Sequence, residues 1–187
     1  MRRAILGYVF AGLFFAIERL ARRGERATSL EVGEADSANV VLIGLSYTTA
    51  LLATPLLNRF RVGRLRYEPL GWLGVVIAAL GTVLRVSAMR TLGEFYTRAL
   101  LVTEEQRVVD TGPYAVVRHP GYAGSMMIWI GVALALRNWL TALVTGVLML
   151  VAYGRRIRSE ETMLRNALGE QYERYQHRTR RLVPFIY

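Results

Sequence analysis

The chain has 187 residues, of which 53% are hydrophobic, and a net charge of +10; this length suits one compact unit rather than two domains. The absence of Cys excludes disulfides and thiol nucleophiles, and with only two His we predict no metal site. All 24 basic residues are Arg, and they flank apolar blocks instead of forming one stripe, which favours membrane lipids over nucleic acid as the partner.

Five apolar segments predict five membrane-spanning helices, at residues 4–17, 40–57, 70–89, 122–136 and 140–153. The first follows Arg2 and Arg3 but lacks a small-x-small cleavage site, so we interpret it as a retained span rather than a signal peptide. We expect the second to end at Pro55 and Asn58. Near the end of the third, Arg85 is expected to extend its charged group to the membrane interface.

The last two apolar segments are joined only by Arg137 and Asn138, which is too short for anything but a tight helical hairpin. After the fifth segment the sequence becomes amphipathic and charged. We predict that it leaves the membrane as a helix through about Leu168, pauses at Gly169 and resumes through Tyr175.

These patterns predict an all-α, polytopic integral membrane protein with about five transmembrane helices and a C-terminal amphipathic helix. We expect a single domain over residues 1–187. Residues 1–69 would carry the first two spans, and residues 70–187 would form the catalytic part.

The distribution of Arg predicts the orientation of the chain. Five spans place the loop at 19–26, the loop at 90–118 and the tail on one side, with sixteen Arg against seven on the other. The excess predicts that the long loop and the tail face the cytoplasm, in a cell (inner) membrane. Four Arg within residues 59–66 count against this orientation.

Two polar segments stand out, at residues 108–124 and 155–164, and the predicted hairpin brings them to the same membrane face. Arg156 and Glu160 are four residues apart and share one helix face, which by itself indicates a surface ion pair. Taken singly, His119 would be a helix cap, and Tyr114 and Tyr122 would be aromatic residues of the membrane interface.

The combined pattern is more specific than any of these residues alone. Tyr114 through Gly124, with Gly112 two residues before it, resembles the G-x-Y-x-x-x-R-H-P-x-Y-x-G motif of the isoprenylcysteine carboxyl methyltransferase family. The end of the chain resembles the end of that family, in Glu160-Glu161-x-x-Leu164, Gly169-x-x-Tyr172-x-x-Tyr175 and Arg181-Leu182-Val183-Pro184. The resemblance covers residues 80–187, and the first two spans match only as spans.

The resemblance implies an S-adenosylmethionine site between the loop and the tail, without the soluble methyltransferase fold. It implies that Glu160 takes the ammonium of the cofactor and that Arg156 faces the carboxylate of the substrate, and we expect Arg118 to be the second catalytic residue. The expected cofactor-binding residues are Gln106, Arg107, Val108, Val109, Tyr114, His119, Pro120, Gly121, Tyr122, Glu160 and Glu161. Many relatives have His where this chain has Gln106, so that contact differs in detail.

The function expected from this resemblance is methyl transfer to a lipophilic acceptor, a carboxylate of an isoprenoid or prenylcysteine-like substrate. The partner would then be a lipophilic small molecule or a lipid-anchored substrate. Three alternatives remain open. One is a phospholipid amine or small thiol as acceptor, with Glu161 or His119 deprotonating an amine. The others are an NADPH-dependent sterol-type membrane reductase and a membrane interaction protein without enzymatic activity.

Overall fold

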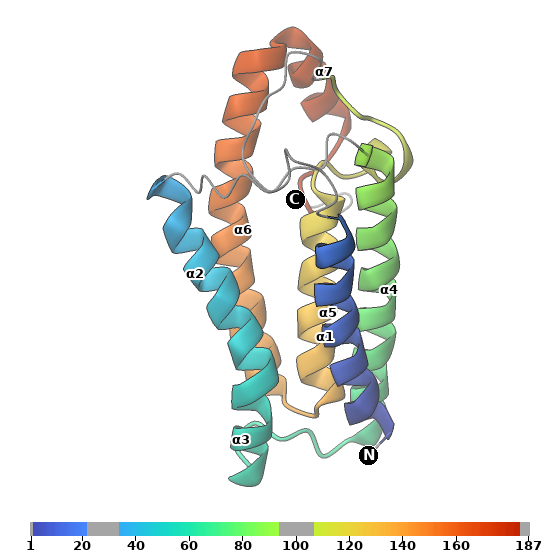
Figure 1. Ribbon diagram of the computed structural model, residues 1–187, viewed down its shortest axis with the longest axis vertical. Coiled ribbons are helices and arrows are strands. Elements are labelled where there is room, and N and C mark those ends of the chain that lie inside the picture. Colours follow the sequence, from blue (N-terminus) through green and yellow to red (C-terminus); the bar gives the residue numbers. More distant parts are fainter. Residues whose placement is uncertain (1, 22–33, 94–106, 184–187) are drawn as a thin grey trace.

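The computed structural model describes residues 2–21, 34–93 and 107–183, and every regular element in these ranges is a helix (Figure 1). Three of the helices are long and apolar enough to cross a membrane, at Ala38–Arg59, Glu68–Leu92 and Trp139–Leu168, and Pro120–Ala135 is a shorter apolar helix. The prediction of an all-helical integral membrane protein is therefore confirmed.

The N-terminal part consists of α1 (Arg2–Ala21), α2 (Glu34–Thr48), the π-helical turn η2 (Thr49–Ala53) and α3 (Thr54–Arg59). Pro55 lies in the first turn of α3. Because Pro has no N–H and its ring crowds the carbonyl four residues earlier, the helix widens into a π turn at this point. The prediction that Pro55 helps to end the second span was wrong, since the helical stretch passes through it, but the stretch does end at Arg59, one residue after Asn58.

The C-terminal part consists of α4 (Glu68–Leu92), η4 (Gly112–Ala115), α5 (Pro120–Ala135), α6 (Trp139–Leu168) and α7 (Glu170–Arg178). Helices α4 and α5 touch backbone to backbone along a seam of glycines. A Cβ atom added to Gly81 would lie 2.7 Å from the carbonyl oxygen of Gly124, and one added to Gly131 would lie 2.6 Å from the backbone nitrogen of Ala78. Such close packing of small residues joins helices inside a membrane.

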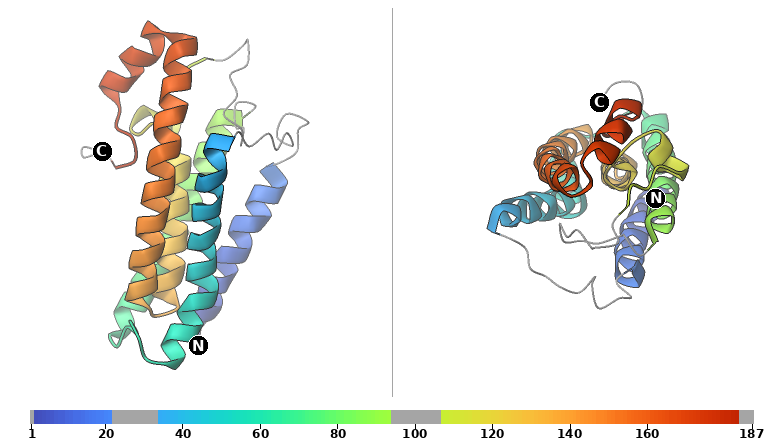
Figure 2. Two further views of the ribbon diagram at one scale, coloured as in Figure 1. Left: turned by 90° about the vertical axis from the view of Figure 1, so that its left-hand side faces the viewer. Right: turned by 90° about the horizontal axis from the view of Figure 1, so that it is seen from above.

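The predicted hairpin between α5 and α6 is confirmed. Arg137 has a φ of 69°, and Asn138 caps α6 by accepting a hydrogen bond of 3.0 Å from the backbone nitrogen of Thr141. The fully buried amide of Asn138 also donates to the side chain of Asn58 and to the carbonyl of Val62. The turn is therefore fixed at one end of the bundle, and the start of α5 lies with the second half of α6 at the other end (Figures 1 and 2).

Helix α6 continues without a break from the apolar segment into the charged tail. It ends at Gly169, whose φ of 52° turns the chain into α7, as the sequence predicted. Helix α7 buries Tyr172 and Tyr175 and leaves its charged residues outside, so the predicted C-terminal amphipathic helix is confirmed.

The expectation that Arg85 extends to the membrane interface was wrong. Its side chain is buried, and its guanidinium forms an ion pair with Glu18 of α1. Because Glu18 neutralises the charge of Arg85 inside the bundle, the guanidinium does not have to extend to water.

Candidate active site

The polar segments of the sequence meet at the end of the bundle where α5 begins (Figure 2). The tail returns beside the loop that precedes α5, and Val117 and Arg180 form a parallel bridge. The backbone nitrogen of Arg118 donates to the carbonyl of Arg180 at 2.7 Å, and that of His119 donates to Arg181 at 3.0 Å. The convergence predicted from the hairpin is confirmed.

Glu161 is the centre of a buried ionic cluster. Its Oε1 atom accepts from Nε of Arg118 at 2.8 Å and lies 3.3 Å from Nε2 of His119. Its Oε2 atom accepts from Nε and Nη2 of Arg181 at 3.0 and 2.8 Å. With a side chain only 2% exposed, Glu161 holds the loop, α6 and the tail together.

Arg118 uses the rest of its guanidinium to hold the end of α7. Its Nη1 atom donates to the carbonyl of Thr179 at 2.6 Å and to that of Gln176 at 3.1 Å. The side chain of Arg118 is 9% exposed. Both Arg118 and Glu161 therefore bind other parts of the chain.

Arg156 and Glu160 are joined by a third residue, Tyr122. The hydroxyl of Tyr122 donates to Oε2 of Glu160 at 2.8 Å and accepts from Nε of Arg156 at 2.9 Å. The Glu160 side chain is 27% exposed, and Arg156 is half-buried. These two charges, unlike the carboxylate of Glu161, lie where a ligand from outside can reach them.

Stacked rings hold Tyr122 in place. Its ring stacks on Tyr153 of α6 with 4.7 Å between centroids and on His119 with 5.7 Å. The Nδ1 atom of His119 lies 3.8 Å from Glu160. The ring of Tyr122 is thus clamped while its hydroxyl points to both charged groups.

Helix α7 packs against the loop that precedes α5. The hydroxyl of Tyr175 donates to the carbonyl of Tyr114 at 2.8 Å. Burial raises the pKa of the Tyr175 phenol, and burial followed by the nearby Glu161 and Glu160 carboxylates raises that of Tyr172. Both phenols therefore stay neutral over the physiological pH range.

The other expected cofactor residues lie at the same end of the molecule. Val108 and Val109 are half-buried in the loop, and Arg107 is exposed. Pro120 is buried, and Gly121 follows it in the first turn of α5. Gln106 lies outside the described residues. No group of three or more metal-ligating side chains occurs among the residues that the structure describes.

Three residues of the cluster were missed from the sequence. Arg181 belongs to the closing Arg-Leu-Val-Pro segment and could have been proposed from it as a partner of Glu161. Tyr153 and Thr179 have no sequence signal, because their contacts depend on how α6 and the tail pack.

The arrangement offers an accessible carboxylate, an accessible guanidinium and a phenol between them. Such a set suits a ligand that carries both an ammonium and a carboxylate, or two ligands that bring one charge each. It contains no nucleophilic side chain in an activated pair, so it suits positioning more than covalent catalysis.

The comparison with known families decides between these possibilities. The model of the isoprenylcysteine carboxyl methyltransferase (ICMT) family matches residues 72–166. The chain belongs to this family. The matched range includes most of α4, all of α5, and Arg156 and Glu161 of α6, so the membership rests on much of the part of the chain that forms the site.

Curated relatives extend the similarity to almost the whole chain. A probable protein-S-isoprenylcysteine O-methyltransferase of Oryza sativa subsp. indica is 28% identical over 181 residues, which cover 96% of this chain and 88% of the relative. The protein-S-isoprenylcysteine O-methyltransferase B of Arabidopsis thaliana is 31% identical over 115 residues, or 60% of this chain and 58% of the relative. The resemblance found in the motifs is thereby confirmed.

A solved structure agrees with the fold. The eukaryotic intramembrane Ras methyltransferase ICMT superposes with a TM-score of 0.73 at 25% identity, over 95% of this chain and 64% of that protein. This chain therefore spans a little under two thirds of the length of that relative. The prediction of a membrane methyltransferase is confirmed at the level of the family.

Proposed function

We propose that the chain transfers a methyl group from S-adenosylmethionine to the carboxylate of a lipophilic acceptor, an isoprenoid or prenylcysteine-like acid. The observation that carries this proposal is the Tyr122 hydroxyl joined to Arg156 and Glu160. This arrangement supports a negative contact and a positive contact for ligands, side by side. The chain belongs to a family of carboxyl methyltransferases, which suits these two contacts.

The donor set fits S-adenosylmethionine, which when bound supplies a methyl group on a sulfonium to a nucleophile. Glu160 would take its ammonium, because that carboxylate is partly exposed and has Tyr122 beside it. The remaining contacts would come from the loop and the first turn of α5, at Gln106, Arg107, Val108, Val109, Tyr114, His119, Pro120 and Gly121.

Arg156 would hold the carboxylate of the acceptor. Its Nε atom donates to the Tyr122 hydroxyl, which fixes the direction of the guanidinium beside Glu160 on the partly exposed side of the site. A carboxylate at neutral pH is already a nucleophile, so these residues need to orient it rather than remove a proton.

The ionic cluster favours a carboxylate over an amine as the acceptor. A phospholipid amine arrives protonated and needs a base, for which the candidates were Glu161 and His119. Both oxygens of Glu161 are held by arginines, and His119 contacts that same carboxylate. A carboxylate acceptor makes no such demand.

We further propose that Glu161 and Arg118 act by positioning. Glu161 was expected to bind the cofactor and Arg118 to be catalytic, but both side chains are buried and bonded within the chain. Their burial supports a role in holding the loop, α6 and the tail around the ligand contacts.

The proposed topology has five spans, with α1 and α5 added to the three long apolar helices. The site would face the cytoplasm in a cell inner membrane, because the Arg excess lies on that side. The ion pair between Arg178 and Asp110, at 3.4 Å, supports a shared side for loop and tail. Single Cys residues at Asp110→Cys and Gln176→Cys test this, since labelling from opposite sides would refute the topology.

Calorimetry on the detergent-purified protein tests the proposed cofactor. S-adenosylmethionine and S-adenosylhomocysteine should both bind after treatment with a chelator, and NADPH should not. Binding of NADPH alone would indicate the reductase alternative, and binding of none would favour a protein without enzymatic activity. Transfer of a labelled methyl group to a farnesylcysteine analogue, compared with phosphatidylethanolamine, tests the acceptor.

A further inference from the structure

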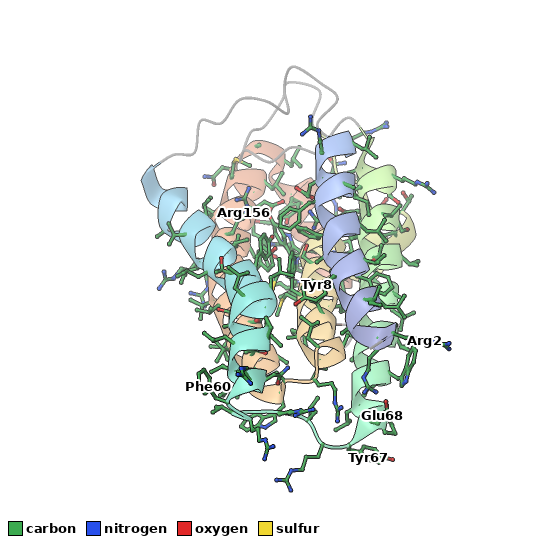
Figure 3. All side chains as sticks on the ribbon, turned by 60° about the horizontal axis from the view of Figure 1, so that its bottom comes forward. Arg2, Tyr8, Phe60, Tyr67, Glu68 and Arg156 are labelled. Carbon is green, nitrogen blue, oxygen red and sulfur yellow. The ribbon has the colours of Figure 1, made fainter. Side chains whose placement is uncertain are left out.

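Helices α1 and α4 run parallel and are joined by two ion pairs, one at each end. At the end away from the site, Arg3 of α1 pairs with Glu68 of α4, whose side chain is 67% exposed. Figure 3 shows Glu68 at the start of α4. At the site end, Glu18 of α1 pairs with Arg85 of α4, and both side chains are less than a tenth exposed. The two pairs connect the same helices in very different surroundings.

The pair at the site end reaches a third helix. Nη1 of Arg85 donates to the carbonyl of Gly121 at 2.9 Å and to the hydroxyl of Ser125, both in α5. The Ser125 hydroxyl donates in turn to the same Gly121 carbonyl at 2.9 Å. One planar guanidinium thus bonds α1 on one side and the first turns of α5 on the other.

The first turn of α5 links this guanidinium to the site. It begins Pro120-Gly121, in which the glycine adds no side chain to the packing, and Gly124 lies against the backbone of α4. Gly121 is directly followed by Tyr122, whose hydroxyl joins Arg156 and Glu160. A change in the direction of this turn would move that hydroxyl.

A role in tethering alone does not explain the pair. Helix α4 is already joined to α5 along the glycine seam, and burying two charges brings little net stability. The guanidinium also lies 4.8 Å from the centroid of the Phe14 ring of α1, which encloses it further. Arg85 bonds α5 as well as Glu18, whereas the guanidinium of Arg3 donates to the carbonyl of Glu68, its own partner in α4.

We propose that Glu18 and Arg85 are positioning residues that set the first turn of α5 and so direct the Tyr122 hydroxyl toward Arg156 and Glu160. This inference rests on the proposed function of that site. Helix α1, which lies outside the range matched by the family model, then contributes to activity without contacting the ligands.

The test compares Glu18→Gln with Glu68→Gln, because each removes the acidic partner of one α1–α4 ion pair. Three quantities are measured on detergent-purified protein: the melting temperature, amide hydrogen exchange of residues 121–125, and methyl transfer. Glu18→Gln should speed exchange in the first turn of α5 and reduce transfer by about 10- to 100-fold, as a small misplacement of a positioning group does. Glu68→Gln should leave both within about twofold of the wild type.

The double variant Glu18→Arg with Arg85→Glu separates tethering from positioning. It restores opposite charges between α1 and α4, but a carboxylate at position 85 cannot donate to the Gly121 carbonyl. We expect the melting temperature to recover while exchange stays fast and transfer stays low. Recovery of all three quantities would overturn the inference and leave the pair as a tether.

Arg85→Lys covers the case in which Glu18→Gln fails to fold. It keeps the charge opposite Glu18 but replaces the planar fork, so exchange in residues 121–125 should rise in a folded protein. Unchanged exchange in Arg85→Lys, or in a folded Glu18→Gln, would overturn the inference. If the wild type transfers no methyl group, the proposed function is refuted. Hydrogen exchange still tests the positioning role in that case.

Discussion

The hydroxyl of Tyr122 donates to Oε2 of Glu160 at 2.8 Å, and the hydroxyl oxygen of Tyr122 accepts a bond of 2.9 Å from Nε of Arg156. Arg156 and Glu160 stand four residues apart on α6, but the phenol from α5 joins them. The first turn of α5 and the charged part of α6 therefore share one bonding atom at the centre of the site.

Tyr122→Phe should weaken binding of S-adenosylhomocysteine while preserving the fold. The ring still stacks on Tyr153, but the charged groups of Glu160 and Arg156 each lose the hydrogen bond with the phenol hydroxyl. Such bonds contribute about 1.5–3 kcal/mol, which corresponds to roughly ten- to a hundredfold in affinity. Calorimetry and a melting curve measure the two effects, with Tyr8→Phe on the exposed face of α1 as the control.

Glu160→Gln and Arg156→Ala should affect different steps. Glu160→Gln should weaken cofactor binding about ten- to a hundredfold, because an amide cannot pair with an ammonium as a carboxylate does. Arg156→Ala should leave cofactor affinity within a few fold and lower kcat for an acidic acceptor. Cofactor affinity and methyl transfer are measured for both variants.

Two results would contradict this division of roles. If Arg156→Ala loses cofactor binding as severely as Glu160→Gln, both residues contact the cofactor. If both variants keep wild-type activity and lose less than about 1 kcal/mol of stability, the pair is a surface ion pair only.

The sequence was sufficient to predict that two distant segments meet. The apolar segments at 122–136 and 140–153 are separated by only three residues, 137–139, and helices joined by so short a turn must run antiparallel. The start of one and the end of the other then lie together. The pause at Gly169 was also predictable, because Gly adopts the positive φ that ends α6.

The detailed roles of the charged residues were not predictable. Glu160 and Glu161 are adjacent in sequence, but Glu161 points to Arg118 and Arg181 inside, and Glu160 points to Tyr122 at the partly exposed side. A helix turns about 100° per residue, so neighbours face different surroundings, and only the packed structure shows which is buried. The prediction for Arg85 failed because its partner Glu18 lies 67 residues away in the sequence, and only the packed structure brings the two together.

Raising the pH above about 10 should detach α7 from the site. Burial holds the pKa of Tyr172 and Tyr175 above the usual value near 10, which the phenols regain when α7 is released. Their contribution to docking is therefore complete below pH 10 and is lost as the pH rises further. Limited proteolysis of the tail at pH 8 and pH 10.5 measures this loss.

Replacing both phenols should remove most of this alkaline effect. In the double variant Tyr172→Phe with Tyr175→Phe, the docking of α7 should be weaker than in wild type by about 1 kcal/mol at pH 8, because the bond to the Tyr114 carbonyl is gone. Its proteolysis should change less between pH 8 and pH 10.5. The exposed Tyr67→Phe is the control, and an equal alkaline response in all three proteins would contradict the assignment to Tyr172 and Tyr175.

Arg181→Ala should loosen the C-terminal tail while its neighbour Arg180→Ala should not. The guanidinium of Arg181 donates two hydrogen bonds to Oε2 of the buried Glu161. Arg180 is exposed and pairs with the loop through its backbone, which the substitution preserves. Removing Arg181 leaves half of a buried carboxylate without its cation. The loss should be about 1.5–3 kcal/mol, moderated because Arg118 and His119 still contact Oε1.

The two Arg variants also test how Glu161 acts. If Glu161 positions the tail, as its burial supports, Arg181→Ala should expose residues 170–183 to protease and weaken cofactor binding in parallel, and high cofactor concentration should restore protection by mass action. If Glu161 instead contacts the cofactor directly, freeing Oε2 from Arg181 should strengthen binding. The two roles are distinguished by measuring protease protection against cofactor concentration for wild type, Arg181→Ala and Arg180→Ala. Only the positioning role predicts that Arg181→Ala alone needs more cofactor than wild type to reach half-protection.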